Sequence, residues 1–219
     1  MKPITISHSH LKTFEQCPKK YFHLYVAKDA PKEKSPELDF GNEAHKALEE
    51  RVRDGIVLPA KFAHWEKFTT LLDDHRPRVE LKAGINIQGH ATGFFDSDVW
   101  VRGKLDISIV YDNVGAIFDW KTGKPREDSD ELEIFGVLLK AAQPQLTRIT
   151  GHYIWLKEGL EHVGEKHDLS DTAVKLAQIR GRYEKIERAA RFKEYPPEQG
   201  PLCPWCPIKT CQFHPYRER

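Results

Sequence analysis

The chain has 219 residues, 39% of them hydrophobic and 11% aromatic, which suits one globular domain with a full core. Its 34 lysines and arginines balance 33 aspartates and glutamates, which leaves a net charge of +1 and excludes a chain that is basic throughout. Any basic surface for nucleic acid must therefore be local. No apolar run reaches membrane-spanning length, and the first residues show no signal-peptide core. We therefore expect a cytoplasmic protein with reduced thiols and no membrane partner.

The chain begins with helical patterns. Apolar residues at helical spacing predict a helix over residues 9–28, with Ser9 as its N-cap. A link rich in proline, lysine and glutamate follows over 29–38. The same spacing predicts a second helix over 41–54 and a third over 61–75.

Alternating apolar and polar residues then predict a group of strands. These strands cover residues 78–82, 85–95, 99–110 and 114–121. A helix over 129–142, a strand over 149–156 and a long helix over 170–193 complete the pattern. This order indicates an α/β fold in which helices flank a small mixed sheet.

Two neighbouring strands of this prediction carry charged residues on one face. Residues i and i+2 of a strand point to the same side, so Asp119 and Lys121 share a face, while Phe118 and Trp120 point the other way. Asp106 belongs to the polar set of the preceding strand. If the two strands pair, two carboxylates and an ammonium group meet on one patch of the sheet.

Such a patch has the chemistry of a divalent-cation site. Two neighbouring carboxylates repel each other, and Mg²⁺ or Mn²⁺ relieves that repulsion through oxygen ligands. A bound cation also lowers the pKa of a water molecule, and Lys121 can orient that water or stabilise an anionic transition state. Alternatively, Asp106 and Asp119 are exposed strand or turn residues. The apolar neighbours of Asp119 favour an internal strand, where an unpaired charge is costly.

The series Asp106, then Asp119-Trp120-Lys121, resembles the PD-(D/E)XK nuclease superfamily. It is similar to the RecB-like branch, which includes the CRISPR-associated four-cysteine nucleases and the AddB-type nuclease domains. The Gly41-x-x-x-His45 sequence resembles a motif of that branch. The resemblance implies a restriction-endonuclease-like core in which Lys121 is the catalytic lysine. The implied metal ligands are His45, Asp106, Asp119 and the carbonyl of Trp120.

The chain departs from the branch on the helix after the lysine strand. Glu131 and Phe135 stand where the branch has glutamine and tyrosine. Glu131 is either a further catalytic residue that supports the site through hydrogen bonds or a solvated helix residue. Glu80, on an earlier strand, either faces the site or faces solvent, and we expect solvent.

Four cysteines form a second pattern. Cys17 lies in the first predicted helix, whereas Cys203, Cys206 and Cys211 fall within nine residues near the end of the sequence. In a reducing compartment this pattern favours a metal site over disulfides. Spacing leaves two occupants open, namely Zn²⁺ with four thiolates and a 4Fe–4S cluster. The remaining interpretation is a small buried apolar set without metal.

The resemblance to the four-cysteine nucleases implies the 4Fe–4S cluster, since those proteins combine one distant cysteine with a C-terminal trio. Its ligands would be Cys17, Cys203, Cys206 and Cys211. The cluster would join the N- and C-terminal segments, so its binding energy would contribute to folding. Cys17 and residues 203–211 would then form an iron–sulfur subregion of a single RecB-like nuclease domain over 1–219.

The resemblance implies a metal-dependent nuclease that hydrolyses phosphodiester bonds in DNA. We expect an exonuclease on single-stranded or end-containing DNA, working in recombination, repair or phage or CRISPR DNA processing. Recombination or CRISPR adaptation proteins are the expected protein partners. One alternative is a non-catalytic DNA-binding subunit of a nuclease complex, which the presence of Asp106, Asp119 and Lys121 disfavours. The other is a zinc-stabilised nucleic-acid-binding module, which iron content would distinguish.

Overall fold

The structure, a computed structural model, describes residues 3–31, 35–125 and 127–216. The chain divides into two compact units. The sheet unit comprises Met1–Thr5 and Ser35–Leu176, and the terminal unit comprises Ile6–Lys34 and Ala177–Arg219. No helix in the described ranges is long and apolar enough to cross a membrane. The single domain predicted over 1–219 stays a prediction.

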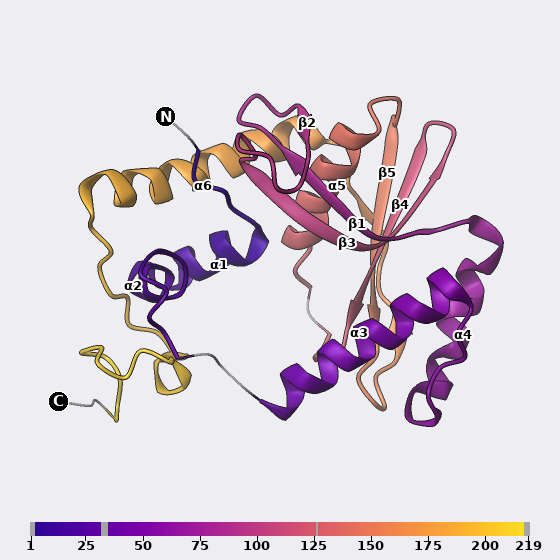
Figure 1. Cartoon of the computed structure of the whole chain (residues 1–219), viewed down its shortest axis with the longest axis horizontal. Helices are drawn as coiled ribbons and strands as arrows, with labels where there is room; N and C mark the ends of the chain where they lie inside the picture. Colours follow the sequence, from indigo (N-terminus) through magenta and orange to yellow (C-terminus); the bar gives the residue numbers. More distant parts are fainter. Residues whose placement is uncertain (1–2, 32–34, 126, 217–219) are drawn as a thin grey trace. The chain divides into compact units, whose positions relative to one another are not determined.

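The strands of the sheet unit form one mixed sheet in the order β2-β1-β3-β4-β5-β6, and β7 also pairs with β5 (Figure 1). Their bounds are Arg78–Ile85 (β1), Ala91–Thr92 (β2), Val101–Tyr111 (β3), Val114–Lys121 (β4), Arg148–Trp155 (β5), His162–Val163 (β6) and His167–Asp168 (β7). β3 and β4 are antiparallel, whereas β4 and β5 are parallel and are connected through helix α5, Asp130–Ala142. This confirms the small mixed sheet flanked by helices.

The register of β4 with its two neighbours positions the charged residues. Ile107 lies opposite Phe118 in the antiparallel pair of β3 and β4, so Asp106 and Asp119 are adjacent at the next step. On the other side, β5 places Tyr153 beside Asp119 and Trp155 beside Lys121. The predicted pairing of the two charged strands is therefore confirmed.

Helix α3, Pro36–Asp54, covers one face of the sheet. Ser35 caps its first turn and Gly55 ends it with a left-handed φ of 71°. It begins five residues earlier than the predicted 41–54, because Pro36 suits the first turn of a helix. The helix packs on a core cluster of the sheet unit. That cluster contains Ala44, Leu48, Leu58, Phe62, Trp65, Phe68, Leu72, Ile107, Trp120, Ile154 and Leu156.

Helix α5 packs on the opposite face of the sheet (Figure 1). Glycines in the strands allow its close approach, since a methyl group at Gly103 would lie 2.9 Å from both Leu138 and Phe135. At Gly115 a methyl group would lie 3.1 Å from Leu139. The absence of side chains at these two strand positions brings α5 close to the sheet.

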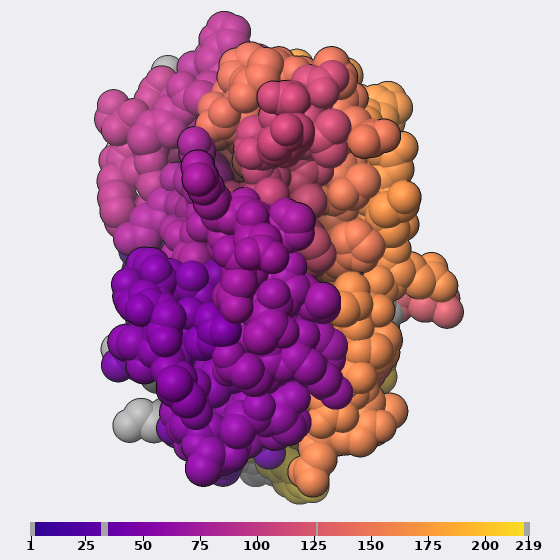
Figure 2. All heavy atoms as spheres, turned by 90° about the vertical axis from the view of Figure 1, so that its right-hand side faces the viewer, coloured from indigo at the N-terminus to yellow at the C-terminus, as the bar shows by residue number. Residues whose placement is uncertain are grey.

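Two predicted elements of the sheet unit differ from the structure. The helix predicted over 61–75 is a succession of short turns: a 3₁₀ helix, the four-residue helix α4 (Glu66–Thr69) and a second 3₁₀ helix. The strand predicted over 85–95 is mainly a turn, because the side chain of Asn86 accepts hydrogen bonds from the backbone N–H groups of Gln88 and His90. Figure 2 shows the α3–α4 segment beside the chain after β5, where His64 lies 3.6 Å from Glu161.

The terminal unit starts with a broken helix. The helix predicted over 9–28 is divided into α1 (His8–Gln16), α2 (Pro18–Tyr21) and a π-helical turn. Cys17 between them is extended, with φ −169° and ψ 110°. The cause is Pro18, which lacks an N–H group and disfavours the helical conformation of the residue before it. The long helix α6, Thr172–Phe192, runs from the sheet unit into the terminal unit.

Candidate functional site

A polar cleft of about 650 Å³ opens on the sheet unit beside the middle of β3 and the C-terminal end of β4. Helix α3 contributes Gly41 and His45, which are one turn apart and therefore lie on the same side of the helix. A methyl group at Gly41 would lie 3.3 Å from Oγ1 of Thr122, which follows β4. The small glycine thus lets α3 approach the end of β4 closely, and His45 reaches the cleft.

The structure brings the two predicted aspartates together with His45. Asp106 and Asp119 are only 6% and 4% exposed. Oδ2 of Asp106 accepts a hydrogen bond of 2.9 Å from the backbone N–H of Trp120 and lies 3.4 Å from Nδ1 of His45. The side chain of Trp120 is in the core cluster on the α3 face of the sheet. Each strand therefore anchors a buried carboxylate at the cleft.

Lys121 connects the strands to helix α5. Its Nζ lies 2.6 Å from Oδ2 of Asp119 and donates a hydrogen bond of 2.7 Å to Oε2 of Glu131. Oδ2 of Asp119 is buried and, despite this ion pair, accepts no hydrogen bond of ordinary geometry. Of the two interpretations of Glu131, the structure favours a residue at the site. Tyr153 of β5 also lies next to Lys121, since its ring centre is 5.3 Å from Nζ of Lys121.

The pKa values at the site are shifted by burial and by the charges of neighbouring groups. Burial raises the pKa of Asp119 well above its ordinary value, while Lys121 opposes the shift and Asp106 favours it. Burial alone would lower the pKa of Lys121, but the carboxylates of Asp119 and Glu131 outweigh it and raise that pKa. For His45, burial is likewise outweighed by Asp106, which raises the pKa. Asp119 thus lies where an added positive charge is favourable.

The chemistry of these residues fits a hard divalent cation. Carboxylate oxygens and an imidazole are suitable ligands, and the only close partner of the buried Oδ2 of Asp119 in the described residues is the ammonium of Lys121. In the described ranges, however, no three side chains of His, Cys, Asp or Glu are grouped closely enough to hold a metal ion. At Asp119 the ammonium of Lys121 balances the negative charge. A cation at Asp119 would therefore share or replace the contact of this carboxylate with Lys121.

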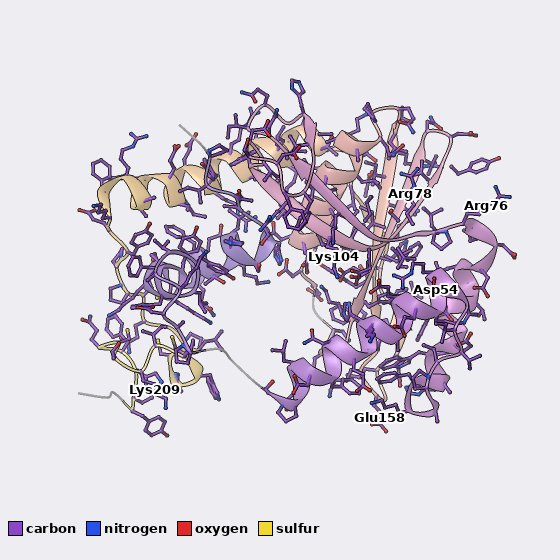
Figure 3. The ribbon with its side chains drawn as sticks, viewed as in Figure 1. Asp54, Arg76, Arg78, Lys104, Glu158 and Lys209 are labelled. Carbon is purple, nitrogen blue, oxygen red and sulfur yellow. The ribbon has the colours of Figure 1, made fainter. Side chains whose placement is uncertain are left out.

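A second ion pair lies along the same cleft. Lys104 of β3 pairs with Glu80 of β1, and both line the cleft (Figure 3 labels Lys104). Glu80 has a φ of 56°, a left-handed conformation that costs a non-glycine residue about 1 to 3 kcal/mol. Its side chain is 16% exposed. The expectation that Glu80 faces solvent is therefore wrong.

The four cysteines all belong to the terminal unit and line one pocket of about 150 Å³. Two sulfur atoms accept backbone hydrogen bonds, Cys17 from Glu198 at 3.5 Å and Cys203 from Gly200 at 3.3 Å. Soft sulfur donors of this kind fit zinc or an iron–sulfur cluster. The cysteines are not among any metal-binding group in the described residues, so the geometry does not establish the 4Fe–4S cluster.

Comparisons with known proteins agree with this geometry. The sequence model of the PD-(D/E)XK nuclease superfamily matches residues 5–94 and 62–211. The chain belongs to the PD-(D/E)XK nuclease superfamily. This PD-(D/E)XK protein has no significant match among curated proteins.

Solved structures resemble this PD-(D/E)XK protein at low identity. A candidate exonuclease from Eubacterium rectale has a TM-score of 0.53 and 16% identity, covering 92% of this chain and 86% of its own. The crystal structure of SSO0001 has a TM-score of 0.44 and 14% identity, covering 98% of this chain and 87% of its own. The first likeness supports the fold alone.

The predictions from the sequence missed Lys104 and Tyr153 at this cleft and assigned Glu80 to solvent. Lys104 stands two residues before Asp106 on the same strand, and this spacing could have indicated it. Tyr153 reaches the site through the parallel pairing of β5 with β4, which the sequence does not specify. Glu80 has a left-handed backbone conformation, which no turn-forming residue in the sequence indicates.

Proposed function

We propose that this protein is a divalent-metal-dependent deoxyribonuclease of the RecB-like branch. The observation that carries the proposal is the convergence of Asp106, Asp119 and Lys121 at one cleft beside His45. Superfamily membership supports a nuclease. An exonuclease acting on single-stranded or end-containing DNA is the form that we propose, in recombination, repair or CRISPR-related processing.

In this mechanism His45, Asp106, Asp119 and the carbonyl of Trp120 would hold Mg²⁺ or Mn²⁺. When bound, the cation would neutralise charge and lower the pKa of a water molecule. Lys121 donates hydrogen bonds from its ammonium to the phosphate oxygens, where negative charge develops in the transition state. Glu131, which is paired with the ammonium of Lys121, would hold this ammonium on the α5 side of the cleft when a cation is bound.

We also propose that the cysteine pocket of the terminal unit holds a 4Fe–4S cluster, with Zn²⁺ as the alternative occupant. The support is that Cys17, Cys203, Cys206 and Cys211 line one pocket although Cys17 is far from the others in sequence. The backbone N–H groups directed at two of the sulfurs would stabilise thiolate ligands. The cluster would join the start and the end of the terminal unit.

The test is cleavage of end-labelled DNA by anaerobically purified protein. Linear single-stranded, linear double-stranded and circular single-stranded DNA are each incubated with Mg²⁺, Mn²⁺ or EDTA. We expect metal-dependent loss of linear single strands and resistance of circles, because an exonuclease needs an end. Cleaved circles would contradict the exonuclease. DNA binding without cleavage of any substrate would support the non-catalytic subunit, for which the charge of Glu131 beside Lys121 is the favouring observation.

A further inference from the structure

The cleft of the sheet unit contains a lysine that the proposed mechanism does not use. Lys121 is in contact with Asp119 and Glu131. Lys46, on α3, is 74% exposed and lies 3.8 Å from Glu50. Lys104 is intermediate between these two lysines. Its side chain is 48% exposed, and its ammonium forms an ion pair with Glu80, whose side chain is 16% exposed. An ammonium has three N–H donors, so Lys104 has donors left for a ligand in the cleft.

The position of Lys104 relates it directly to the reaction centre. Lys104 and Asp106 are residues i and i+2 of β3, so they lie on the same side of the strand. Two steps of a strand separate their Cα atoms by about 6.6 Å. That step is comparable to the separation of successive phosphates along an extended nucleic-acid strand. A strand whose scissile phosphate lies at Asp106 and Asp119 can therefore place a neighbouring phosphate at Lys104.

Glu80 pairs with Lys104 from an unusual backbone conformation. The residue directly opposite Lys104 in the β1–β3 pair is Lys82, and like charges directly opposite each other are unfavourable. Glu80 stands two residues away and pairs with Lys104 diagonally from a left-handed conformation. Strain of this kind in a non-glycine residue occurs chiefly where it serves a site.

We propose that Lys104 binds a backbone phosphate next to the scissile phosphate, and that Glu80 is the positioning residue that holds Lys104 at this subsite. The ligand class is a phosphodiester of a nucleic-acid strand, recognised by charge and without regard to base. This inference rests on the proposed function, since it assumes that DNA lies in the cleft.

The test is the salt dependence of DNA binding, which needs no cleavage. A fluorescein-labelled single-stranded oligonucleotide is titrated with full-length protein in Ca²⁺ at several salt concentrations. Each phosphate contact contributes about 0.7 to the slope of log K against log salt for a single strand. We expect Lys104→Ala to bind more weakly and to reduce the slope by about 0.7, and Lys104→Arg to restore both.

Lys82→Ala is the matched control. It removes the same charge from the neighbouring strand, but Lys82 is exposed and does not line the cleft. We expect its slope to equal that of the wild type. An unchanged slope in Lys104→Ala, with wild-type protein that binds DNA, would overturn the inference alone. Wild-type protein that binds no DNA would overturn the proposed function with it.

The Glu80→Gln variant distinguishes a positioning role of Glu80 from a direct effect of its negative charge on DNA binding. The substitution removes a negative charge from the cleft, so electrostatics alone would tighten DNA binding. The positioning role predicts weaker binding, with no additional loss when Glu80→Gln is combined with Lys104→Ala. Tighter binding in Glu80→Gln, at an unchanged melting temperature, would refute the positioning role.

Discussion

At the scale of single residues, the site is a set of buried charges that balance one another. Asp119 is almost fully buried and depends on the ammonium of Lys121 for its nearest positive charge. The carboxylate of Asp106 instead accepts a hydrogen bond from the backbone N–H of Trp120. The same two carboxylates that the structure stabilises in these ways are the proposed metal ligands. Their roles in folding and in metal binding can therefore be separated by substitution.

Asp106→Ala and Asp106→Asn should differ in stability. Both remove the negative charge, but only alanine leaves the buried N–H group of Trp120 without an acceptor. An unsatisfied buried donor costs about 1 to 3 kcal/mol. Urea unfolding should therefore show Asp106→Ala to be less stable than Asp106→Asn by about that amount. Equal stability of the two variants would mean that the hydrogen bond contributes nothing.

Residue patterns predicted part of this site. Strand alternation predicted that Asp119 and Lys121 share a face, and the observed contact between them agrees. The ion pair between Glu80 and Lys104 was not predicted, because it joins diagonal positions of two strands and involves a residue with a left-handed φ. The alternation of apolar and polar residues within one strand predicts neither the diagonal contact nor the left-handed φ.

At the scale of elements, periodicity predicted the long regular segments best. The pairing of β3 with β4 and the extents of α5 and α6 follow the apolar spacing closely. Local chemistry overrode periodicity at the division between α1 and α2, where Pro18 keeps Cys17 extended. The side chain of Asn86 likewise organises a turn where a strand was predicted. These exceptions arise from single residues within otherwise regular patterns.

Gly103→Ala tests the packing of α5 on the sheet. The added methyl group would lie 2.9 Å from Leu138 and Phe135, which is closer than side chains tolerate without displacement. We expect a loss of about 1 to 3 kcal/mol in the free energy of unfolding. Gly181→Ala in α6 is the control, since nothing lies within 4 Å of its added methyl group and helix propensity should stabilise it by about 1 kcal/mol. A neutral Gly103→Ala would contradict the close packing.

At the scale of the whole molecule, the two candidate sites belong to different units. The polar cleft lies within the sheet unit, and the cysteine pocket lies within the terminal unit. The catalytic proposal and the cluster proposal therefore rest on separate residues. Loss of the cluster should act first on the folding of the terminal unit, because its ligands come from both ends of the sequence.

Cys206→Ser should release iron and lower the melting temperature. The variant removes one of four proposed ligands, whereas Trp205→Ser changes the adjacent residue, which is 73% exposed and serves as control. Metal content by elemental analysis and thermal unfolding are measured on anaerobically purified protein. A wild-type protein without bound iron or zinc, or a Cys206→Ser variant with unchanged metal content and unfolding, would refute the cluster.

The most direct test of the central claim is the cleavage rate of the Lys121→Ala variant on end-labelled single-stranded DNA with Mn²⁺. Lys124→Ala is the matched control, since Lys124 is an exposed lysine of the same segment outside the cleft. Binding of the uncleaved oligonucleotide in Ca²⁺ verifies that both variants are folded. We predict a loss of rate on the order of 10²- to 10³-fold in Lys121→Ala and none in Lys124→Ala. Cleavage by Lys121→Ala at the wild-type rate would contradict the assignment of this cleft as the active site.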